Sequence, residues 1–224
     1  MNILSYPLSE RTPMYGGGPS AIIRQEKSIS KGDSCNTLQI SMSNHTGTHI
    51  DLPVHFNILG KTLTDYPPNF WFVEKVGCVF INMHPENRAG RLINPMDFQK
   101  SENNDISSDC EAILLKTGCC TERCSEMYWQ NPPGIDPELP DYLRKKFPKL
   151  RFLGMDLISV SSFAAREAGR LAHKAFLCHP NPILPIEDMD LSCLPKTISN
   201  MLIAPLYIKD ADGTPCTVFA NIGV

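Results

Sequence analysis

Three of the six histidines in this 224-residue chain lie within the eleven residues from His45 to His55. They are His45, His49 and His55, and Asp51 stands among them. Neutral imidazole and carboxylate groups are the ligands that hold catalytic zinc and similar ions. Two imidazoles and one carboxylate leave a tetrahedral metal one open position, where the pKa of a bound water falls to about 7. The spacing therefore predicts that His45, His49 and Asp51 hold a metal ion that activates water.

His55 follows a proline and can approach such a site from another side. Two roles are open for it: a further metal ligand, or a proton carrier, because imidazole titrates near neutral pH. A site with two ions needs ligands from a second segment of the chain, and His173 and Glu187 are the candidates. Asp188 and Asp190 offer the same carboxylate group as Glu187, so the residues alone leave that choice open.

The cysteines offer a competing metal site. Cys119, Cys120 and Cys124 lie close together, and Cys110 is the near neighbour that would complete a four-cysteine structural zinc site. A second interpretation is that all of them are ordinary reduced thiols. A third is a cysteine nucleophile paired with a histidine, although no spacing singles out such a pair.

Strands and helices alternate along the chain around these residues. Helix-forming composition and an acidic-to-basic charge order predict helices at 95–100, 136–147 and 163–177. Short apolar or alternating runs between turn formers predict strands at 38–42, 76–82, 111–117, 152–160, 183–187, 201–208 and 217–222.

Three further features complete this organisation. The alternation of apolar and polar residues at 38–42 is typical of a strand with one exposed face. The glycine-rich segment 12–20 predicts a loop that could cover a pocket, and 210–213 is a hairpin turn signal. Because strands and helices interleave without a repeat or a linker, we expect one α/β domain over residues 1–224.

Charge and composition exclude several classes of partner. The 21 basic and 24 acidic residues give a net charge of −3 and form neither a basic arm nor an acidic tail, so we expect no nucleic-acid partner. No apolar segment approaches the roughly 20 residues that cross a bilayer, so we expect no membrane partner. The chain opens without a charged and apolar leader, and its nine cysteines are an odd number. We therefore expect reduced thiols and a cytoplasmic protein.

The run 45–56 resembles the signature His-x-Gly-Thr-His-x-Asp-x-Pro-x-His of the cyclase family of metal-dependent hydrolases, which includes bacterial kynurenine formamidases and isatin hydrolases. The resemblance implies a swivelling β/β/α fold, a single cyclase-like domain, and assembly as a homodimer or homotetramer. Other segments that are similar to parts of this family are 12–19, 115–118, 152–156, 173–177 and 212–215.

Carried to single residues, the resemblance implies two metal positions. His45, His49 and Asp51 would bind one ion, and Asp51 would bridge to a second. His173 and Glu187 match the ligands that complete the second position. The mixed nitrogen and oxygen ligands suit zinc or manganese, with one or two ions per subunit.

These features predict an enzyme, a metal-dependent hydrolase that cleaves a C–N bond other than a peptide bond. Its small-molecule substrate would be an amide, a lactam or a related carbonyl compound, attacked by metal-activated water in arylformamidase-like chemistry. The resemblance implies that His55 donates and accepts the proton. Tyr15 and Phe56 are candidate substrate-binding residues, whereas Phe70 and Trp71 belong either to the same pocket or to the core. The rival hypothesis is a metal-bearing binding or regulatory protein of the same fold without turnover.

Overall fold

A mixed β-sheet that closes on itself forms the centre of the protein, in a computed structural model that describes residues 1–101 and 106–222. Its strands are β1 (Asn2–Ile3), β4 (His49–Asp51), β5 (Phe72–Val73), β6 (Val76–Phe80), β8 (Ala112–Lys116), β10 (Phe152–Met155), β11 (Leu184–Glu187), β12 (Ile198–Pro205) and β13 (Gly213–Ile222). The strand order is β1-β13-β4-β11-β10-β8-β6-β12-β5, and β12 also pairs with β13. The seven strands from β13 to β12 therefore make a barrel-like ring.

Helices and two small sheets surround this ring. The α-helices of the described residues are α1 (Pro95–Lys100), α2 (Met127–Gln130), α3 (Leu139–Lys146) and α4 (Arg166–Leu177). The small sheets pair β2 (Ile22–Lys27) with β3 (Thr37–Ser41), and β7 (Leu92–Ile93) with β9 (Gly134–Ile135). None of the helices in the described part of the chain has both the length and the apolar character that a bilayer crossing requires.

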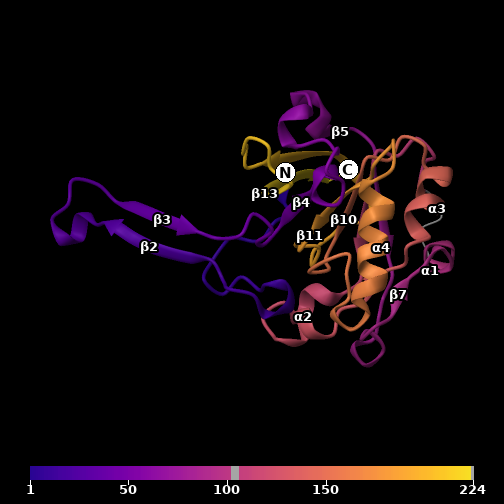
Figure 1. Ribbon diagram of the computed structural model, residues 1–224, viewed down its shortest axis with the longest axis horizontal. Helices are drawn as coiled ribbons and strands as arrows, with labels where there is room; N and C mark the ends of the chain where they lie inside the picture. The colour runs from indigo at the N-terminus through magenta and orange to yellow at the C-terminus, as the bar shows by residue number, and fades with distance from the viewer. Residues whose placement is uncertain (102–105, 223–224) are drawn as a thin grey trace.

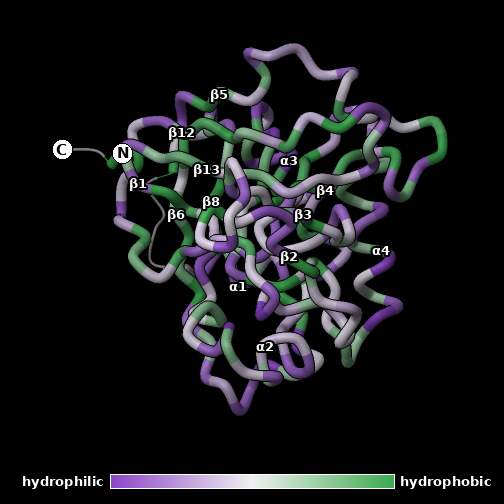
Figure 2. Tube along the Cα trace, turned by 90° about the vertical axis from the view of Figure 1, so that its left-hand side faces the viewer, coloured by the Kyte–Doolittle hydropathy of each residue, from purple (hydrophilic) through white to green (hydrophobic). Residues whose placement is uncertain are grey.

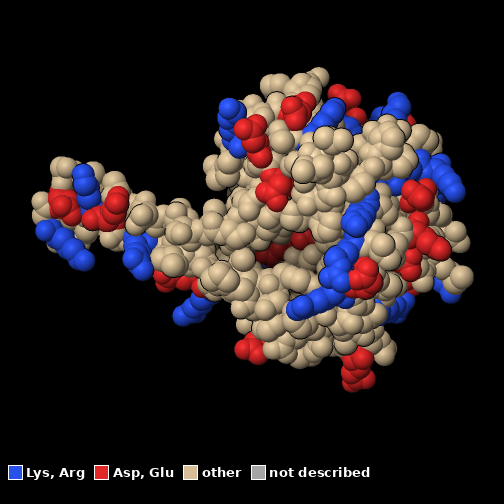
Figure 3. All heavy atoms as spheres, viewed as in Figure 1, with Lys and Arg blue, Asp and Glu red and all other residues tan. Residues whose placement is uncertain are grey.

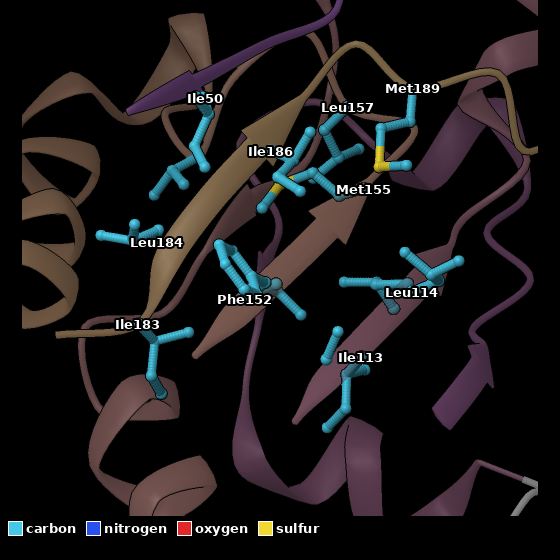
Figure 4. Packing of buried hydrophobic residues seen from close by; sticks show 14 of the residues in the cluster. Ile50, Ile113, Leu114, Phe152, Met155, Leu157, Ile183, Leu184, Ile186 and Met189 are labelled. Carbon is cyan, nitrogen blue, oxygen red and sulfur yellow. The ribbon is translucent and has the colours of Figure 1, made fainter. Parts of the chain in front are cut away.

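The parallel strands β6, β8, β10 and β11 lie where apolar runs predicted buried strands. Residues 112–115 of β8 are all buried, as is usual for parallel strands that are covered on both faces. Figure 4 shows Ile113 and Leu114 of β8 near Phe152 of β10, and Figure 2 shows hydrophobic residues along β6 and β8. Strand β10 is shorter than the predicted strand at 152–160, because the chain bends after Met155.

Helix α4 carries His173 towards the sheet. It begins at Arg166 and not at Phe163 as predicted, because residues 163–165 form a 3-10 turn and Ala165 has a non-helical φ of −136° and ψ of 52°. The buried residues of α4 follow a spacing of three and four, which makes one inner face. His173 lies on that face, whose members are Gly169, Ala172, His173, Phe176 and Leu177.

Strands β2 and β3 form an arm that projects from the body of the molecule (Figure 1). The strand predicted at 38–42 is present as β3, but the prediction that only one of its faces is exposed was wrong. The side chains of Leu38 and Ile40 are 60% and 52% exposed. The physical reason is that β3 pairs with β2 in a separate two-stranded sheet, away from the central ring.

A C-terminal hairpin brings the end of the chain against the histidine motif. Strands β12 and β13 pair antiparallel, and the predicted turn lies between them. The first residues of β13 pair with β4, in the register Gly213 to Asp51 and Pro215 to His49. On its other side β4 pairs with β11, where Glu187 stands opposite His49. Strand β4 therefore holds the motif between two segments from the C-terminal part of the chain.

Candidate metal centre

The histidine and aspartate motif folds as a turn followed by the short strand β4. Gly47 has a φ of +70°, which side chains rarely allow, and a Cβ atom there would lie 2.8 Å from the Leu8 side chain. Side chains alternate along a strand, so His49 and Asp51 share one face of β4 while Ile50 takes the other. Ile50 is fully buried in the hydrophobic core. Packing of Ile50 thereby aims the two polar residues away from the core.

Two adjoining groups of ligand atoms form on that polar face. In the first, His49 Nε2 lies 3.6 Å from Asp51 Oδ1 and 3.3 Å from Glu187 Oε2, and His45 Nδ1 lies 2.9 Å from Asp51 Oδ1. In the second, His173 Nε2 lies 3.5 Å from both Asp51 Oδ2 and Glu187 Oε1. Asp51 and Glu187 each turn one oxygen to His49 and the other to His173. The structure thus brings together the five residues that the sequence offered as ligands.

The spacings of His49 and His173 from the carboxylates fit side chains arranged around a metal ion, whereas His45 Nδ1 forms a hydrogen bond with Asp51 Oδ1 at 2.9 Å. Hydrogen bonds from N–H to O are about 2.7–3.2 Å long, whereas the four contacts of His49 and His173 with the carboxylates measure 3.3–3.6 Å. Two ligand atoms about 2.1 Å from a tetrahedral zinc ion stand about 3.4 Å apart. Imidazole nitrogen and carboxylate oxygen are also the donors that zinc and manganese accept. Geometry and donor chemistry therefore fit metal binding at this cluster.

Backbone carbonyl groups fix which nitrogen of each buried histidine faces the carboxylates. His49 Nδ1 donates to the carbonyl oxygen of Gly47 at 2.8 Å, and His173 Nδ1 donates to that of Gly169 at 2.8 Å. A carbonyl oxygen only accepts, so Nδ1 carries the hydrogen in both rings. Nε2 is then the nitrogen that is available to a metal, as in many protein sites where an outer hydrogen bond orients the ligand.

The buried carboxylates set the protonation of the cluster. Burial disfavours charged His49, but the close contact with the negatively charged Glu187 outweighs burial and raises the pKa of His49 to about 9. Burial acts in the same sense on His173, and its close contacts with the carboxylates of Asp51 and Glu187 raise the pKa of His173 to about 10. Burial opposes ionisation of the carboxyl groups too, yet contacts with the histidines lower the pKa of Asp51 and of Glu187. The ionised carboxylates need nearby positive charge, which metal ions can supply in place of protons.

Of the three acidic residues Glu187, Asp188 and Asp190, only Glu187 points towards the histidines. Glu187 accepts a hydrogen bond from the backbone N–H of Val160 at 2.7 Å, which supports it from behind. Asp188 is buried and pairs with Arg123 at 2.6 Å. Asp190 accepts a hydrogen bond from a neighbouring serine hydroxyl. Among the three acidic residues that the sequence left open, Glu187 is the one that faces the histidines.

His55 stands beside the two groups and contacts a residue that was not expected at the site. Its Nδ1 donates to Asp212 Oδ2 at 2.8 Å, and the same oxygen accepts from His45 Nε2 at 3.1 Å. The sequence signals for Asp212 were its place in the turn at 210–213 and in the family-like segment 212–215, and neither pointed to the site. Ligand atoms of His45, Asp51 and His55 also lie within 4.8 Å of one another, so distance alone permits either role for His55.

A cavity of about 340 Å³ opens above the cluster. Figure 3 shows it as a hollow with acidic side chains at its floor. Tyr15, from the loop predicted to cover a pocket, lines this cavity together with His55 and Phe56. The Phe56 ring stacks on His173 with centroids 4.8 Å apart and an interplanar angle of 16°. The cavity therefore joins aromatic surface to the candidate metal positions.

Phe70 and Trp71, which the sequence left between the substrate pocket and the core, lie at the core. Trp71 is a buried member of the hydrophobic core, and Phe70 packs against that core. Their rings contact one another and also Phe152 of β10. The core interpretation of Phe70 and Trp71 is therefore the one that the structure bears out.

The cysteine cluster shows no metal-site geometry. Among the residues that the structure describes, the groups close enough to hold an ion contain no cysteine. Cys110, Cys119 and Cys120 are buried and Cys124 is exposed. Burial raises the pKa of Cys119 to about 11 and that of Cys120 to about 12, which favours the neutral thiol, whereas zinc binds the thiolate. The structural-zinc alternative finds no support in this arrangement.

Sequence comparison relates the chain to one family. The sequence model of the family described as "Putative cyclase" matches residues 3–162. The kynurenine formamidase of Geobacillus thermodenitrificans (strain NG80-2) is 30% identical over 213 residues, which are 95% of this chain and 92% of that one. The kynurenine formamidase of Bacillus cereus (strain ATCC 14579) is 26% identical over 216 residues, again 95% of this chain and 92% of the relative.

Structural comparison agrees in fold. Isatin hydrolase A from Labrenzia aggregata, solved with bound benzyl benzoate, superposes with a TM-score of 0.78 at 20% sequence identity. The superposition covers 99% of this chain and 93% of that one. The resemblance predicted from residues 45–56 and the expected α/β fold are both confirmed.

Proposed function

This chain belongs to the cyclase family, and from that premise we propose that it is a metal-dependent hydrolase of the C–N bond in a small amide, lactam or related carbonyl compound. One observation carries the proposal: two imidazole and carboxylate groups at ligand spacing lie on the floor of a cavity with aromatic walls. The relatives named kynurenine formamidase support an aryl formamide as the first substrate class to test.

The metal ligands divide into two sets. We assign His45, His49 and Asp51 to one ion, and Asp51, His173 and Glu187 to a second. Glu187 also lies 3.3 Å from His49, so both carboxylates lie between the two positions. A bound zinc or manganese ion would polarise the substrate carbonyl and lower the pKa of water at the site.

His55 is the residue that moves the proton in this proposal. Asp212 occupies its Nδ1, which leaves Nε2 to accept a proton from the attacking water. The same nitrogen then returns the proton to the amine nitrogen of the leaving group. Protonation at that point avoids the departure of a high-energy amide anion. His55 lines the cavity, as this role requires.

Aromatic side chains position the substrate. Phe56 is fixed by its stacking on His173, and Tyr15 supplies another wall with its ring edge-on to Phe163. Flat aromatic surfaces favour an aromatic substituent, which gains offset or edge contacts of about 0.5–1.5 kcal/mol beyond burial of area. An aryl amide would thus place its ring against Tyr15 or Phe56 and its carbonyl towards the floor.

The rival function is a metal-bearing binding or regulatory protein without turnover. Such a protein needs the metal ligands, but it does not need a proton carrier such as His55 held by a hydrogen bond to Asp212. The relatives carry the names of enzymes, which favours turnover.

The test is an assay of metal-depleted and reconstituted protein. We expect chelated protein to be inactive, and added zinc or manganese to restore hydrolysis of formanilides, of lactams or of cyclic imides in a substrate panel. His49→Ala is the metal-site control, and His84→Ala, at an exposed histidine, is the matched neutral control. Metal-loaded wild-type protein that hydrolyses no member of the panel would favour the binding-protein alternative.

We also propose a homodimer or homotetramer, in which the arm packs on a second copy of the chain. The register of β2 and β3 places Ile23, Ile40 and Leu38 on one face, and Arg24 and Gln39 on the other. An amphipathic ribbon with an exposed apolar face is typical of an interface. Light scattering tests this: we expect a multiple of the 25.0 kDa chain mass, reduced by Leu38→Asp and unchanged by Gln39→Asp.

A cytoplasmic location is the final element of the proposal. The odd count of nine cysteines fits reduced thiols, as is usual for proteins of a reducing compartment. Fractionation of the source cells, with antibody detection of the chain, tests the location directly.

A further inference from the structure

A carboxylate from the C-terminal hairpin joins two histidines of the motif. Asp212 Oδ2 accepts from His55 Nδ1 at 2.8 Å and from His45 Nε2 at 3.1 Å. Its other oxygen, Oδ1, accepts from the side-chain amide of Asn44 at 2.6 Å. Asp212 is neither in the histidine motif nor within the residues 3–162 that match the family model. It opens the family-like segment 212–215, and its contacts with the two histidines are seen only in the folded chain.

These hydrogen bonds decide which ring nitrogen of each histidine faces Asp212 and which faces the site. An ionised carboxylate only accepts, so His45 donates from Nε2 and His55 donates from Nδ1. His45 turns its other nitrogen, Nδ1, to Asp51 Oδ1, with which it forms a hydrogen bond at 2.9 Å, and a metal ion bound there would take the place of the Nδ1 hydrogen. His55 presents Nε2 as the nitrogen that can take up a proton. One carboxylate thus selects opposite nitrogens in two adjacent rings, whose centroids are 4.3 Å apart.

The backbone holds Asp212 in this position. Its carbonyl oxygen accepts from the N–H of Leu52 at 2.9 Å, and the next residue, Gly213, pairs with Asp51 in the sheet. A Cβ atom on Gly213 would lie 2.3 Å from Cε1 of His45, so a larger residue would collide with the ring. Asp212 is therefore held just before β13 begins, and Gly213 leaves room for the His45 ring that Asp212 contacts.

We propose that Asp212 is a positioning residue that fixes His45 as a metal ligand and His55 as a proton carrier at the same time. The part that concerns His55 rests on the proposed hydrolase function, while the part that concerns His45 needs metal binding alone. Loss of a carboxylate that orients a metal-binding histidine typically weakens metal affinity or activity about 10–100-fold. We expect Asp212→Asn to weaken metal affinity about 10–100-fold and to lower activity by a similar factor.

The variant pair for the test is Asp212→Asn and Asp210→Asn. Asp210 lies two residues away in the same turn, its side chain is 68% exposed, and asparagine tolerates its positive φ of 58°. Asp210→Asn should therefore match wild type. Asp212→Glu is a further variant that keeps the charge, and we expect it to recover part of the loss. Thermal melting confirms that each variant is folded.

Two readouts do not depend on turnover. Competition with a chelator gives the zinc dissociation constant, which should rise about 10–100-fold in Asp212→Asn. Nitrogen-15 NMR of the zinc-loaded protein should show His55 with its hydrogen on Nδ1 in wild type and shifted towards the Nε2–H tautomer in the variant. In the hydrolase assay, kcat should fall while KM changes little, because substrate walls are untouched.

Each result decides the matter. Weaker zinc binding together with a changed His55 tautomer supports the positioning role. Unchanged zinc affinity and an unchanged tautomer in folded Asp212→Asn overturn it, even if kcat falls. If wild-type protein hydrolyses no substrate, the proposed function fails, but zinc affinity and the tautomer still test Asp212.

Discussion

Glu187 and Asp188 are adjacent in the chain, yet their carboxylates serve different environments. Glu187 Oε2 lies 3.3 Å from His49 Nε2, whereas Asp188 Oδ2 lies 2.6 Å from the Arg123 guanidinium. Asp188 also accepts from the Tyr128 hydroxyl at 2.8 Å and has a φ of +52°. The change of backbone conformation after β11 sends one carboxylate to the candidate metals and the next to a buried ion pair.

Substitution of these two residues should therefore have different effects. Glu187→Gln should lower bound metal and nearly abolish turnover, because its oxygens face both metal positions. Asp188→Asn should instead lower the free energy of unfolding by about 3–5 kcal/mol, since it leaves the Arg123 charge buried without its partner. Elemental analysis and denaturant unfolding measure the two outcomes. Metal loss in Asp188→Asn without loss of stability would contradict this assignment.

The two metal positions should respond separately to their ligands. Asp51 turns an oxygen to each position, so Asp51→Ala should leave little metal in either. His173 belongs to the second position alone, and His173→Ala should retain about half of the wild-type metal content. Elemental analysis of purified protein gives the ratio, with His84→Ala as the control. Equal metal loss in both variants would point to a single shared ion.

His55→Ala should separate proton transfer from metal binding. We expect metal content close to wild type and a kcat lower by about 10²–10⁴, because general acid–base catalysis contributes to that extent. Paired elemental analysis and steady-state kinetics check the result, with exposed His179→Ala as the control. Loss of metal from His55→Ala would make it a ligand, which the distances within its group also permit.

Metal binding should strengthen as pH rises. In the metal-free protein the pKa values of His49 and His173 are raised to about 9 and about 10, so both imidazoles hold an extra proton at pH 7. Metal must displace these protons, so affinity should rise between pH 6 and 9, by up to about tenfold per pH unit for each proton released. Calorimetry in two buffers of different ionisation enthalpy counts the protons. Equal affinity at pH 6.5 and pH 8.5 would contradict the raised pKa values.

Local signals located most elements of the fold. Helix α1 has the predicted bounds 95–100, because Asn94 at its start and Pro95 in its first turn are signals carried by the sequence itself. Strand β13 begins at Gly213, four residues before its predicted start, since a glycine and a proline weaken a strand signal that pairing with β4 restores. The alternation at 38–42 identified a strand, but alternation says which residues share a face and not what covers that face.

The site was predictable to the extent that it is local. His45, His49, Asp51 and His55 stand in one motif, and their chemistry follows from type and spacing. Glu187 needed the family resemblance, because two nearby aspartates carry the same group. Asp212 could not be found from the residues alone. Contacts between residues 167 positions apart, as here with His45, leave no periodicity or spacing in a single sequence.

Because β4 pairs with β13, the site can form only after the C-terminal part of the chain has been synthesised. Both neighbours of β4 in the sheet, β11 and β13, come from the C-terminal part of the chain. At about 5–20 residues per second, the ribosome needs roughly 8–32 s to pass from the histidine motif to Asp212. During that time the motif lacks the strand that shields its edge and the carboxylate that orients two of its rings. Metal loading in the final geometry must therefore follow elongation through the hairpin, and a nascent chain that stalls earlier exposes an unpaired strand edge rich in metal ligands.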